Sequence, residues 1–200
     1  MTSQQFFECI RDDVINNMKE SGILASLTAA QAYIESGVGS SKLSQPPNNN
    51  LFGMKGAFNG QSVYMNTKEY VNGKYITVKA QFRKYPCWAA SIKDHSDLFI
   101  RLKRYENLRG EKNYKQACIK VQKDGYATSP SYSDTLIKTI EQYDLFTWDD
   151  IVIDPDPELD EAVDVFARRV IEGRFGFGHD NRSLRIYELI RKRVNDILKQ

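Results

Sequence analysis

Two glutamates stand in contexts that suit acid–base chemistry. Glu35 ends an apolar-leaning segment, one residue before the turn Gly37-Val38-Gly39. Apolar neighbours and the negative end of a helix dipole would both favour its protonated form, which can deliver a proton to a leaving oxygen. A solvated glutamate at a helix end is the alternative. Glu69 is either a second carboxylate that can activate water or a surface side chain paired with a nearby lysine.

The segments that carry these acids differ in their patterns. Residues 26–36 have the apolar spacing of a helix, and the glycines after them are typical of a helix end. Residues 61–65 and 75–82 have strand composition, with Asn72-Gly73 as the turn between them. Helical patterns return over 88–104, 111–123 and 131–142. We therefore expect an α+β, mainly helical fold, in which a small β-hairpin lobe faces a helical body across a cleft.

Composition excludes several classes of protein. The chain has 200 residues, a mean hydropathy of −0.53 and a formal net charge of +2. This length allows one full domain and a small second one. No apolar run approaches the roughly 20 residues of a membrane span, and no basic segment leads into an apolar one near the N-terminus. We expect no membrane insertion, no Sec-type signal and, from the small net charge, no polyanionic partner.

Cysteine and histidine positions give no sign of a metal site. Cys9, Cys87 and Cys118 cannot build a disulfide framework and lack the spacings of zinc ligands. They are typical of ordinary thiols in a reducing cytoplasm. His95 lies in a polar helical stretch, far in sequence from His179, and we expect it at the surface. The sequence predicts neither a metal nor a cofactor.

Four motifs in order, within about residues 20–148, carry a family resemblance. They are Glu35-Ser36-Gly37-Val38-Gly39, Asn49-Asn50-Leu51-Phe52-Gly53-Met54-Lys55, Thr67-Lys68-Glu69-Tyr70 with Phe82-Arg83-Lys84-Tyr85, and Tyr126-Ala127-Thr128-Ser129-Pro130-Ser131-Tyr132. This set resembles the glucosaminidase family of peptidoglycan hydrolases, glycoside hydrolase family 73. The resemblance implies a lysozyme-like catalytic domain that cleaves the β-1,4 bond after N-acetylglucosamine in bacterial peptidoglycan, as an endo-β-N-acetylglucosaminidase. Val38 departs from the family, whose members usually carry Trp there.

The resemblance also implies roles for single residues. Glu35 would be the general acid and Glu69 the second carboxylate on a mobile lobe. Tyr126 and Tyr132 would line the catalytic cleft, Tyr126 as a catalytic residue and Tyr132 as a substrate-binding one. Tyr126 is alternatively a core or hinge aromatic, and Tyr132 falls at an expected helix start.

Two loop residues are further candidates for substrate binding. Asn50 binds substrate or holds its turn through side-chain-to-backbone hydrogen bonds. Phe52 stacks on a sugar or is buried.

A change in composition near residue 150 predicts a domain boundary. We expect a catalytic domain over 1–150, an Asp/Pro linker over 151–158 and a small three-helix domain over 159–200. Residues 160–198 resemble the Cpl-7-type cell-wall-binding repeat, with Phe177 departing from the usual Asn. Arg174, Asn181 and Arg182 are candidates for muropeptide contacts, or solvated residues of a helical bundle.

Three other functions compete with the first. One is an N-acetylmuramidase of the lysozyme type, and another is a wall-glycan binder without activity. A nucleic-acid binder is disfavoured, because residues 151–200 hold nine basic and ten acidic side chains. The resemblance is to endolysin-like hydrolases, so we expect synthesis in the host cytoplasm, action on the cell wall after lysis, and a monomer.

Overall fold

The chain begins with helix α1 (Ser3–Ser21), which the patterns above do not predict. Its first turn carries a reciprocal cap: Thr2 Oγ1 accepts from Gln5 N at 3.2 Å, and Gln5 Oε1 accepts from Thr2 N at 2.9 Å. The helix ends at Gly22, whose φ of +74° suits glycine. The structure, a computed structural model, describes residues 1–71 and 74–152. Residues 1–152 form one compact unit.

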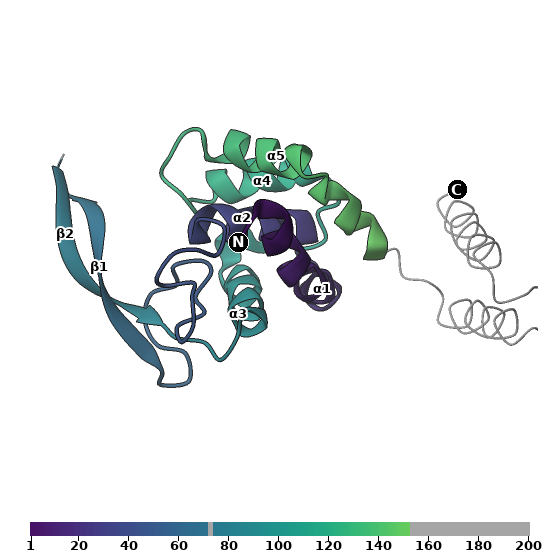
Figure 1. Cartoon of the computed structure of the whole chain (residues 1–200). Coiled ribbons are helices and arrows are strands. Elements are labelled where there is room, and N and C mark those ends of the chain that lie inside the picture. Colours follow the sequence, from purple (N-terminus) through teal and green to yellow (C-terminus); the bar gives the residue numbers. More distant parts are fainter. Residues whose placement is uncertain (72–73, 153–200) are drawn as a thin grey trace, which may run out of the picture. The chain divides into compact units, whose positions relative to one another are not determined.

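Helix α2 (Ala25–Ser36) lies at the centre of this unit (Figure 1). Every residue from Ala25 to Ala32 is buried. A helix buried all round needs small side chains where neighbouring helices approach closely, and Ala29, Ala30 and Ala32 are 0% exposed. The central helix therefore carries Glu35 on a rigid support.

The remaining helices surround α2. They are α3 (Trp88–Arg101), the 3-10 helix η1 (Lys103–Leu108), α4 (Tyr114–Lys123), α5 (Tyr132–Gln142) and the 3-10 helix η2 (Leu145–Val152). Their apolar faces, with that of α1, form one core around α2. The helical pattern predicted over 88–104 is thus divided between α3 and η1.

The last described helix, η2, is hydrogen-bonded to the first turn of α2. Asp149 Oδ1 accepts from Ser26 N at 2.8 Å, and Asp149 Oδ2 accepts from Ser26 Oγ at 2.5 Å. A carboxylate at this end of a helix satisfies amides that have no partner within the helix. Burial nevertheless raises the pKa of Asp149 to about 6, and the bonds from Ser26 only partly oppose this.

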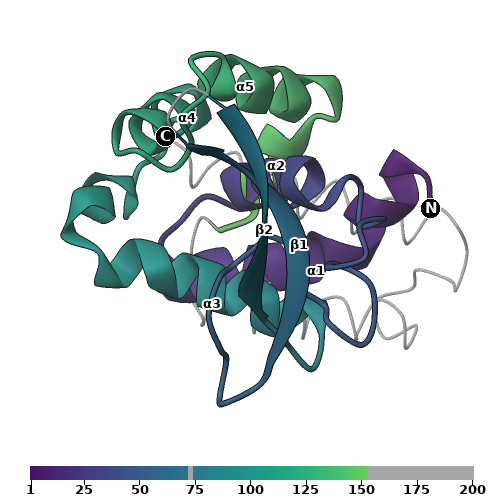
Figure 2. The ribbon, with the colours of Figure 1, turned by 90° about the vertical axis from the view of Figure 1, so that its left-hand side faces the viewer.

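The described strands form one antiparallel hairpin, β1 (Ser62–Val71) and β2 (Lys74–Arg83). The register pairs Ser62 with Arg83 and Val71 with Lys74, which leaves the predicted turn residues 72 and 73 between the strands. Figures 1 and 2 show the hairpin standing along one side of the helical body. Both strands are longer than the sequence predicts.

An ionic network joins the base of the hairpin to α3. Asp94, 5% exposed, accepts a hydrogen bond from the Tyr85 hydroxyl at 2.6 Å and pairs with the Arg83 guanidinium. Arg101 lies 3.7 Å from the other Asp94 oxygen. Removing Arg83 or Tyr85 would leave the buried Asp94 carboxylate short of a partner, so these contacts specify where the hairpin base lies against α3.

The predicted fold class is confirmed in its main features: the described part is mainly helical with one small antiparallel sheet. Ile151 and Val152, predicted to begin the linker, instead end η2. The rest of that linker and the predicted domain over 159–200 lie outside the described residues.

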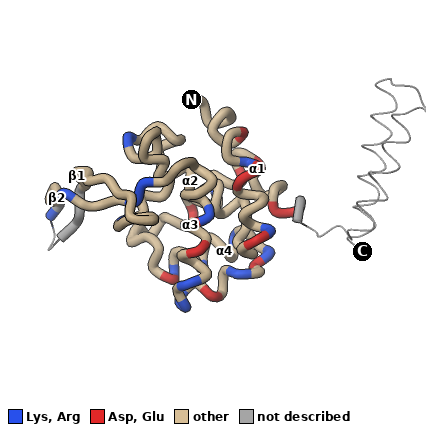
Figure 3. Tube along the Cα trace, turned by 90° about the horizontal axis from the view of Figure 1, so that it is seen from below, with Lys and Arg blue, Asp and Glu red and all other residues tan. Residues whose placement is uncertain are grey.

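Charges of both signs are interspersed over the helices (Figure 3). Among the described residues, no helix combines the length and the apolarity that a membrane crossing requires.

Candidate active site

Glu35 occupies the last turn of α2, and the chain turns sharply after it. Val38 N donates to Tyr33 O at 2.9 Å, and Gly39 N donates to Ser36 Oγ at 2.7 Å. Val38 has a φ of +60°, an unusual conformation for a β-branched residue. The turn beside Glu35 is therefore closely specified by hydrogen bonds, at some conformational cost.

Gly39 is required in this turn for two reasons. Its φ is +67°, and a Cβ there would lie 2.9 Å from the Phe6 ring and 3.0 Å from Trp88. The Gln45 side chain also donates to Gly39 O. The turn after Glu35 thus packs directly on the core and on the next loop.

Tyr132 holds the carboxyl group of Glu35. Its hydroxyl donates to Glu35 Oε1 at 2.8 Å and accepts from Gln31 Nε2 at 3.2 Å. The Tyr132 side chain starts helix α5 and is 7% exposed. The sequence predicted a cleft-lining, substrate-binding Tyr132. That role stays a prediction; the structure shows the Tyr132 hydroxyl bonded to the Glu35 carboxyl, where it can position the acid.

The surroundings of Glu35 favour its protonated form. The residue as a whole is exposed, so a ligand from solvent can reach it. Protein groups around the carboxyl withhold water, and this desolvation raises its pKa above the ordinary 4.5. The Tyr132 hydrogen bond acts in the opposite direction and is the smaller effect. The desolvation predicted for Glu35 is confirmed in direction.

Tyr126 lies beside this pair. Its ring stacks on that of Tyr132, with centroids 5.8 Å apart, and its hydroxyl lies 3.0 Å from His95 Nε2. Burial raises the pKa of Tyr126, and the nearby Glu35 charge acts in the same direction. The structure therefore brings together Glu35, Tyr126 and Tyr132, as the sequence predicted.

His95 is a site residue that the sequence analysis missed. The expectation of a surface histidine is wrong: His95 is 0% exposed, and its ring stacks on Phe52 with centroids 3.8 Å apart. Burial lowers its pKa to about 3, so the ring is neutral. Its Nδ1 has no hydrogen-bond partner in the described part of the chain. Ile92 three residues before it and Phe99 four residues after it mark the same helix face, which was the available signal.

The two loop candidates have structural roles. Asn50, 1% exposed, donates to the carbonyls of Met54 and Arg83 at 3.0 and 2.8 Å, and its oxygen accepts from Met54 N at 3.0 Å. Phe52, 5% exposed, is covered by His95. Neither side chain is free for substrate, so the prediction that they bind it is corrected. Asn50 holds its turn, which was the alternative reading.

The role of Glu69 as the second carboxylate stays a prediction. Glu69 lies on β1 opposite Ile76, and its side chain is outside what the structure describes. Arg174, Asn181 and Arg182 lie outside the described residues.

A profile match defines the family of this chain. The Glucosaminidase family, described as mannosyl-glycoprotein endo-beta-N-acetylglucosaminidase, matches residues 11–145. The chain is 42% identical over 134 residues to the exo-glucosaminidase LytG of Bacillus subtilis, covering 64% of this chain and 47% of that protein. It is 34% identical over 155 residues to a probable N-acetylmuramidase of Lactococcus lactis, covering 74% of this chain and 35% of that one.

A solved structure shows the same fold. The catalytic domain of the autolysin Auto from Listeria monocytogenes superposes with a TM-score of 0.69 at 33% identity, over 73% of this chain and 86% of that domain. The chain spans about half or less of the two curated relatives named above. From the profile match, the motifs and the fold, the chain belongs to the Glucosaminidase family.

Proposed function

We propose that this protein hydrolyses the β-1,4 glycosidic bond after N-acetylglucosamine in the glycan strands of bacterial peptidoglycan. The observation that carries the proposal is the Tyr132–Glu35 pair, in which a solvent-accessible carboxyl has a raised pKa and a fixed orientation. The family membership and the names of the relatives support the glycan substrate. Release from the host cytoplasm onto the wall is part of the same proposal.

In the proposed reaction, Glu35 is the general acid. Its proton passes to the glycosidic oxygen as the bond from that oxygen to the anomeric carbon breaks. Water then adds its oxygen to the anomeric carbon and loses a proton to a carboxylate, for which Glu69 is the candidate. A carboxyl separation of about 6.5–9.5 Å suits an inverting route and about 5–5.5 Å a retaining one. We expect the wider separation, because the two acids stand on separate elements. The N-acetyl group of the substrate is a further candidate nucleophile.

We propose that His95 orients Tyr126. Buried N–H groups without a partner are rarer than unpaired acceptors, so the favoured tautomer carries its proton on Nε2 and donates it to the Tyr126 oxygen. The Tyr126 hydroxyl is then free to donate its own proton toward the reacting sugar. His95 touches no substrate in this scheme and is a positioning residue.

The cleavage position is tested by mass spectrometry of digested wall after borohydride reduction. Reduced N-acetylglucosamine at the new ends supports the proposal. Reduced muramic acid at the new ends would show instead that the enzyme is an N-acetylmuramidase. The name of the lactococcal relative favours that alternative. If digestion produced no new reducing ends and the turbidity of the wall suspension did not fall, the protein would be a glycan binder without hydrolytic activity.

Glu35→Gln tests the general acid directly. The amide keeps the shape and accepts the Tyr132 hydrogen bond but cannot deliver a proton, so we expect turnover to fall by about 10²–10⁴. The matched control is Glu106→Gln, at an exposed glutamate of η1, which should retain full activity. Near-normal turnover in the Glu35 variant would contradict the assignment.

A further inference from the structure

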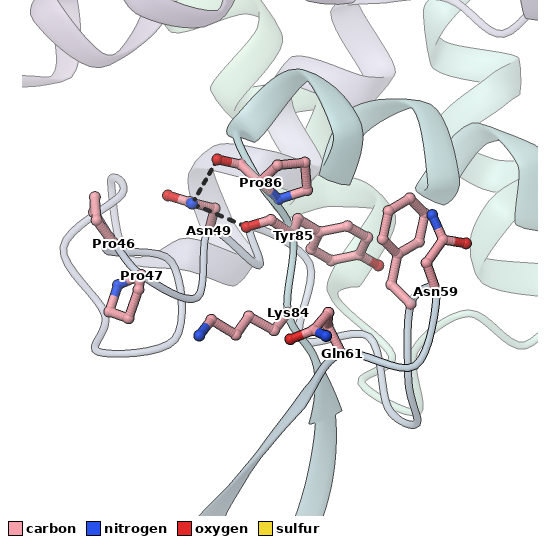
Figure 4. Close-up of a pocket in the computed structure, with 9 residues that line it drawn as sticks. Pro46, Pro47, Asn49, Asn59, Gln61, Lys84, Tyr85 and Pro86 are labelled. Atoms are coloured by element: carbon pink, nitrogen blue, oxygen red, sulfur yellow. Dashed lines mark hydrogen bonds between the residues drawn. The ribbon is translucent and has the colours of Figure 1, made fainter.

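A cavity at the base of the hairpin has no role in the chemistry above. It measures about 520 Å³, within the usual range for small-ligand sites. Pro46, Pro47 and Pro86 contribute apolar surface to its lining, and Tyr85, Lys84 and Gln61 also line it (Figure 4). We call it the hairpin-base pocket. Phe58, Asn49 and Asn59 complete its lining.

The frame of this pocket is preformed. Asn49 Nδ2 donates to the carbonyls of Tyr85 and Pro86 at 3.0 and 3.2 Å, which fixes the loop against the end of the hairpin (Figure 4). Tyr85 is 1% exposed, with its hydroxyl on Asp94 and its ring 4.8 Å from that of Phe58. A ligand would therefore meet walls that need little reorganisation, which favours binding.

Three polar groups of the pocket are unused. The Lys84 ammonium and the side-chain amides of Asn59 and Gln61 make no ion pair or hydrogen bond with the described residues. Lys84 N donates to Gln61 O at 3.3 Å, so the two residues are neighbours in the lining of the pocket (Figure 4). One cation and two amides against proline walls can bind a carboxylate, peptide groups and small apolar side chains at once.

This chemistry fits a peptide better than a sugar. Sugar sites commonly offer an open aromatic face, whereas the Tyr85 ring is buried and the half-buried Phe58 ring packs against it. A short peptide with a free C-terminal carboxylate matches the cation, the amides and the prolines together. The loop that carries Pro46 and Pro47 is also bonded to the turn after Glu35, through Gln45 and Gly39.

We propose that the hairpin-base pocket binds the peptide stem of peptidoglycan, with the C-terminal carboxylate of the stem on Lys84. The identity of the peptide rests on the proposed function. The pocket then recognises the part of the polymer that the glycosidic chemistry does not touch, and it favours peptide-bearing strands over bare glycan.

Binding is measured on the full chain by calorimetry and by amide chemical shifts. The probe is a synthetic stem pentapeptide whose only carboxylate is C-terminal, compared with the same peptide as its C-terminal carboxamide. We expect the carboxamide to bind at least about tenfold more weakly, as for loss of a charge-assisted hydrogen bond. Shifts should concentrate in the amides of residues 58–61, 84 and 85. This comparison uses the unaltered protein, so it does not depend on a variant folding.

Lys84→Gln should bind the carboxylate peptide more weakly than the wild type by the same factor. It should bind the carboxylate and carboxamide peptides with equal affinity. Lys138→Gln, at an exposed lysine of α5, is the matched control and should bind like the wild type. On peptide-bearing glycan, Lys84→Gln should raise KM severalfold with kcat unchanged, and on peptide-free N-acetylglucosamine oligomers it should change neither.

The outcomes separate the two proposals. Equal affinity for the two peptides, or shifts in the pocket with sugar oligomers alone, would overturn the peptide site. Selective binding of the carboxylate peptide by a protein that cleaves no glycan would uphold the pocket and overturn the proposed function.

Discussion

The hydroxyl of Tyr132 controls how readily Glu35 releases its proton. Its hydrogen bond stabilises the charged carboxylate and so lowers a pKa that desolvation raises. In Tyr132→Phe the pKa of Glu35 rises further, and the alkaline limb of the pH–activity profile should move to higher pH. Peak kcat/KM should fall about fivefold to tenfold, because the acid loses a fixed orientation. The profile is measured on a soluble glycan between pH 4 and 9.

Tyr143→Phe is the control for that experiment. It also removes a hydroxyl with two hydrogen-bond contacts, to Ser3 and Tyr33, but away from Glu35. Its alkaline limb should stay in place. An unshifted limb in Tyr132→Phe would show that the hydroxyl does not act on the acid.

His95 gives the second test at this scale. His95→Leu should lower kcat by at least about tenfold, and His95→Gln, whose amide can still donate to Tyr126, should recover part of it. Because the pKa of His95 is about 3, its ring stays neutral and adds no limb to the profile between pH 5 and 8. Nitrogen-15 NMR of the wild type should show the proton on Nε2. A proton on Nδ1, or full kcat in the leucine variant, would refute the positioning role.

The residues of the site differ in how far the sequence could predict them. The acidic role of Glu35 can be predicted from the sequence, because a helix end and apolar neighbours are local features. The structural role of Asn50 depends on Arg83, 33 positions later, and no local pattern shows that contact. The burial of His95 had a local signal in Ile92 and Phe99, but the polar neighbours of His95 in the sequence masked it.

At the scale of elements, the bond between η2 and α2 makes folding depend on pH. The pKa of Asp149 is about 6 in the folded protein against an ordinary 3.8, so the folded state holds this proton more tightly. Its contribution to stability is complete below about pH 3.8 and is lost as the pH rises through 6. Asp149→Asn should therefore remove part of the fall in stability between pH 4 and 7, on the order of 3 kcal/mol.

Urea unfolding at several pH values measures that difference. Asp150→Asn, at an exposed neighbour, is the control and should keep most of the dependence. Parallel curves for the wild type and Asp149→Asn would contradict the assignment.

Element prediction succeeded where the pattern was periodic and failed where tertiary bonds decide. The central helix, the hairpin and α5 follow from spacing and turn residues. Helix α1 was missed although its apolar residues recur with helical spacing, at Phe6, Ile10 and Val14 among others. Helix η2 extends to Val152, and Asp149 within it accepts hydrogen bonds from Ser26, 123 positions earlier. The local Asp/Pro composition gives no sign of this distant contact and suggested a linker instead.

At the scale of the molecule, we expect truncation after Ile153 to leave a folded hydrolase. The core of the described part is built from residues 6–145 of its own sequence. Turnover of soluble glycans should stay within about twofold of the full chain, whereas binding to intact walls should weaken at least about tenfold through lost avidity. Pull-down on purified walls and kinetics on soluble glycans measure the two. An insoluble or inactive truncated chain would show that the two parts fold together.

The bond between Asp149 and Ser26 also determines where the molecule bears mechanical load. Val152 lies three residues after Asp149, which accepts two hydrogen bonds from Ser26 in the first turn of α2. Tension applied to the chain at Val152 would therefore be transmitted to that turn through these two bonds. Glu35 stands nine residues further along this helix, about 14 Å away. Pulling would therefore strain the first turn of α2 before it disturbs the acid, and a hydrolase tethered through that end could keep its active geometry while under strain.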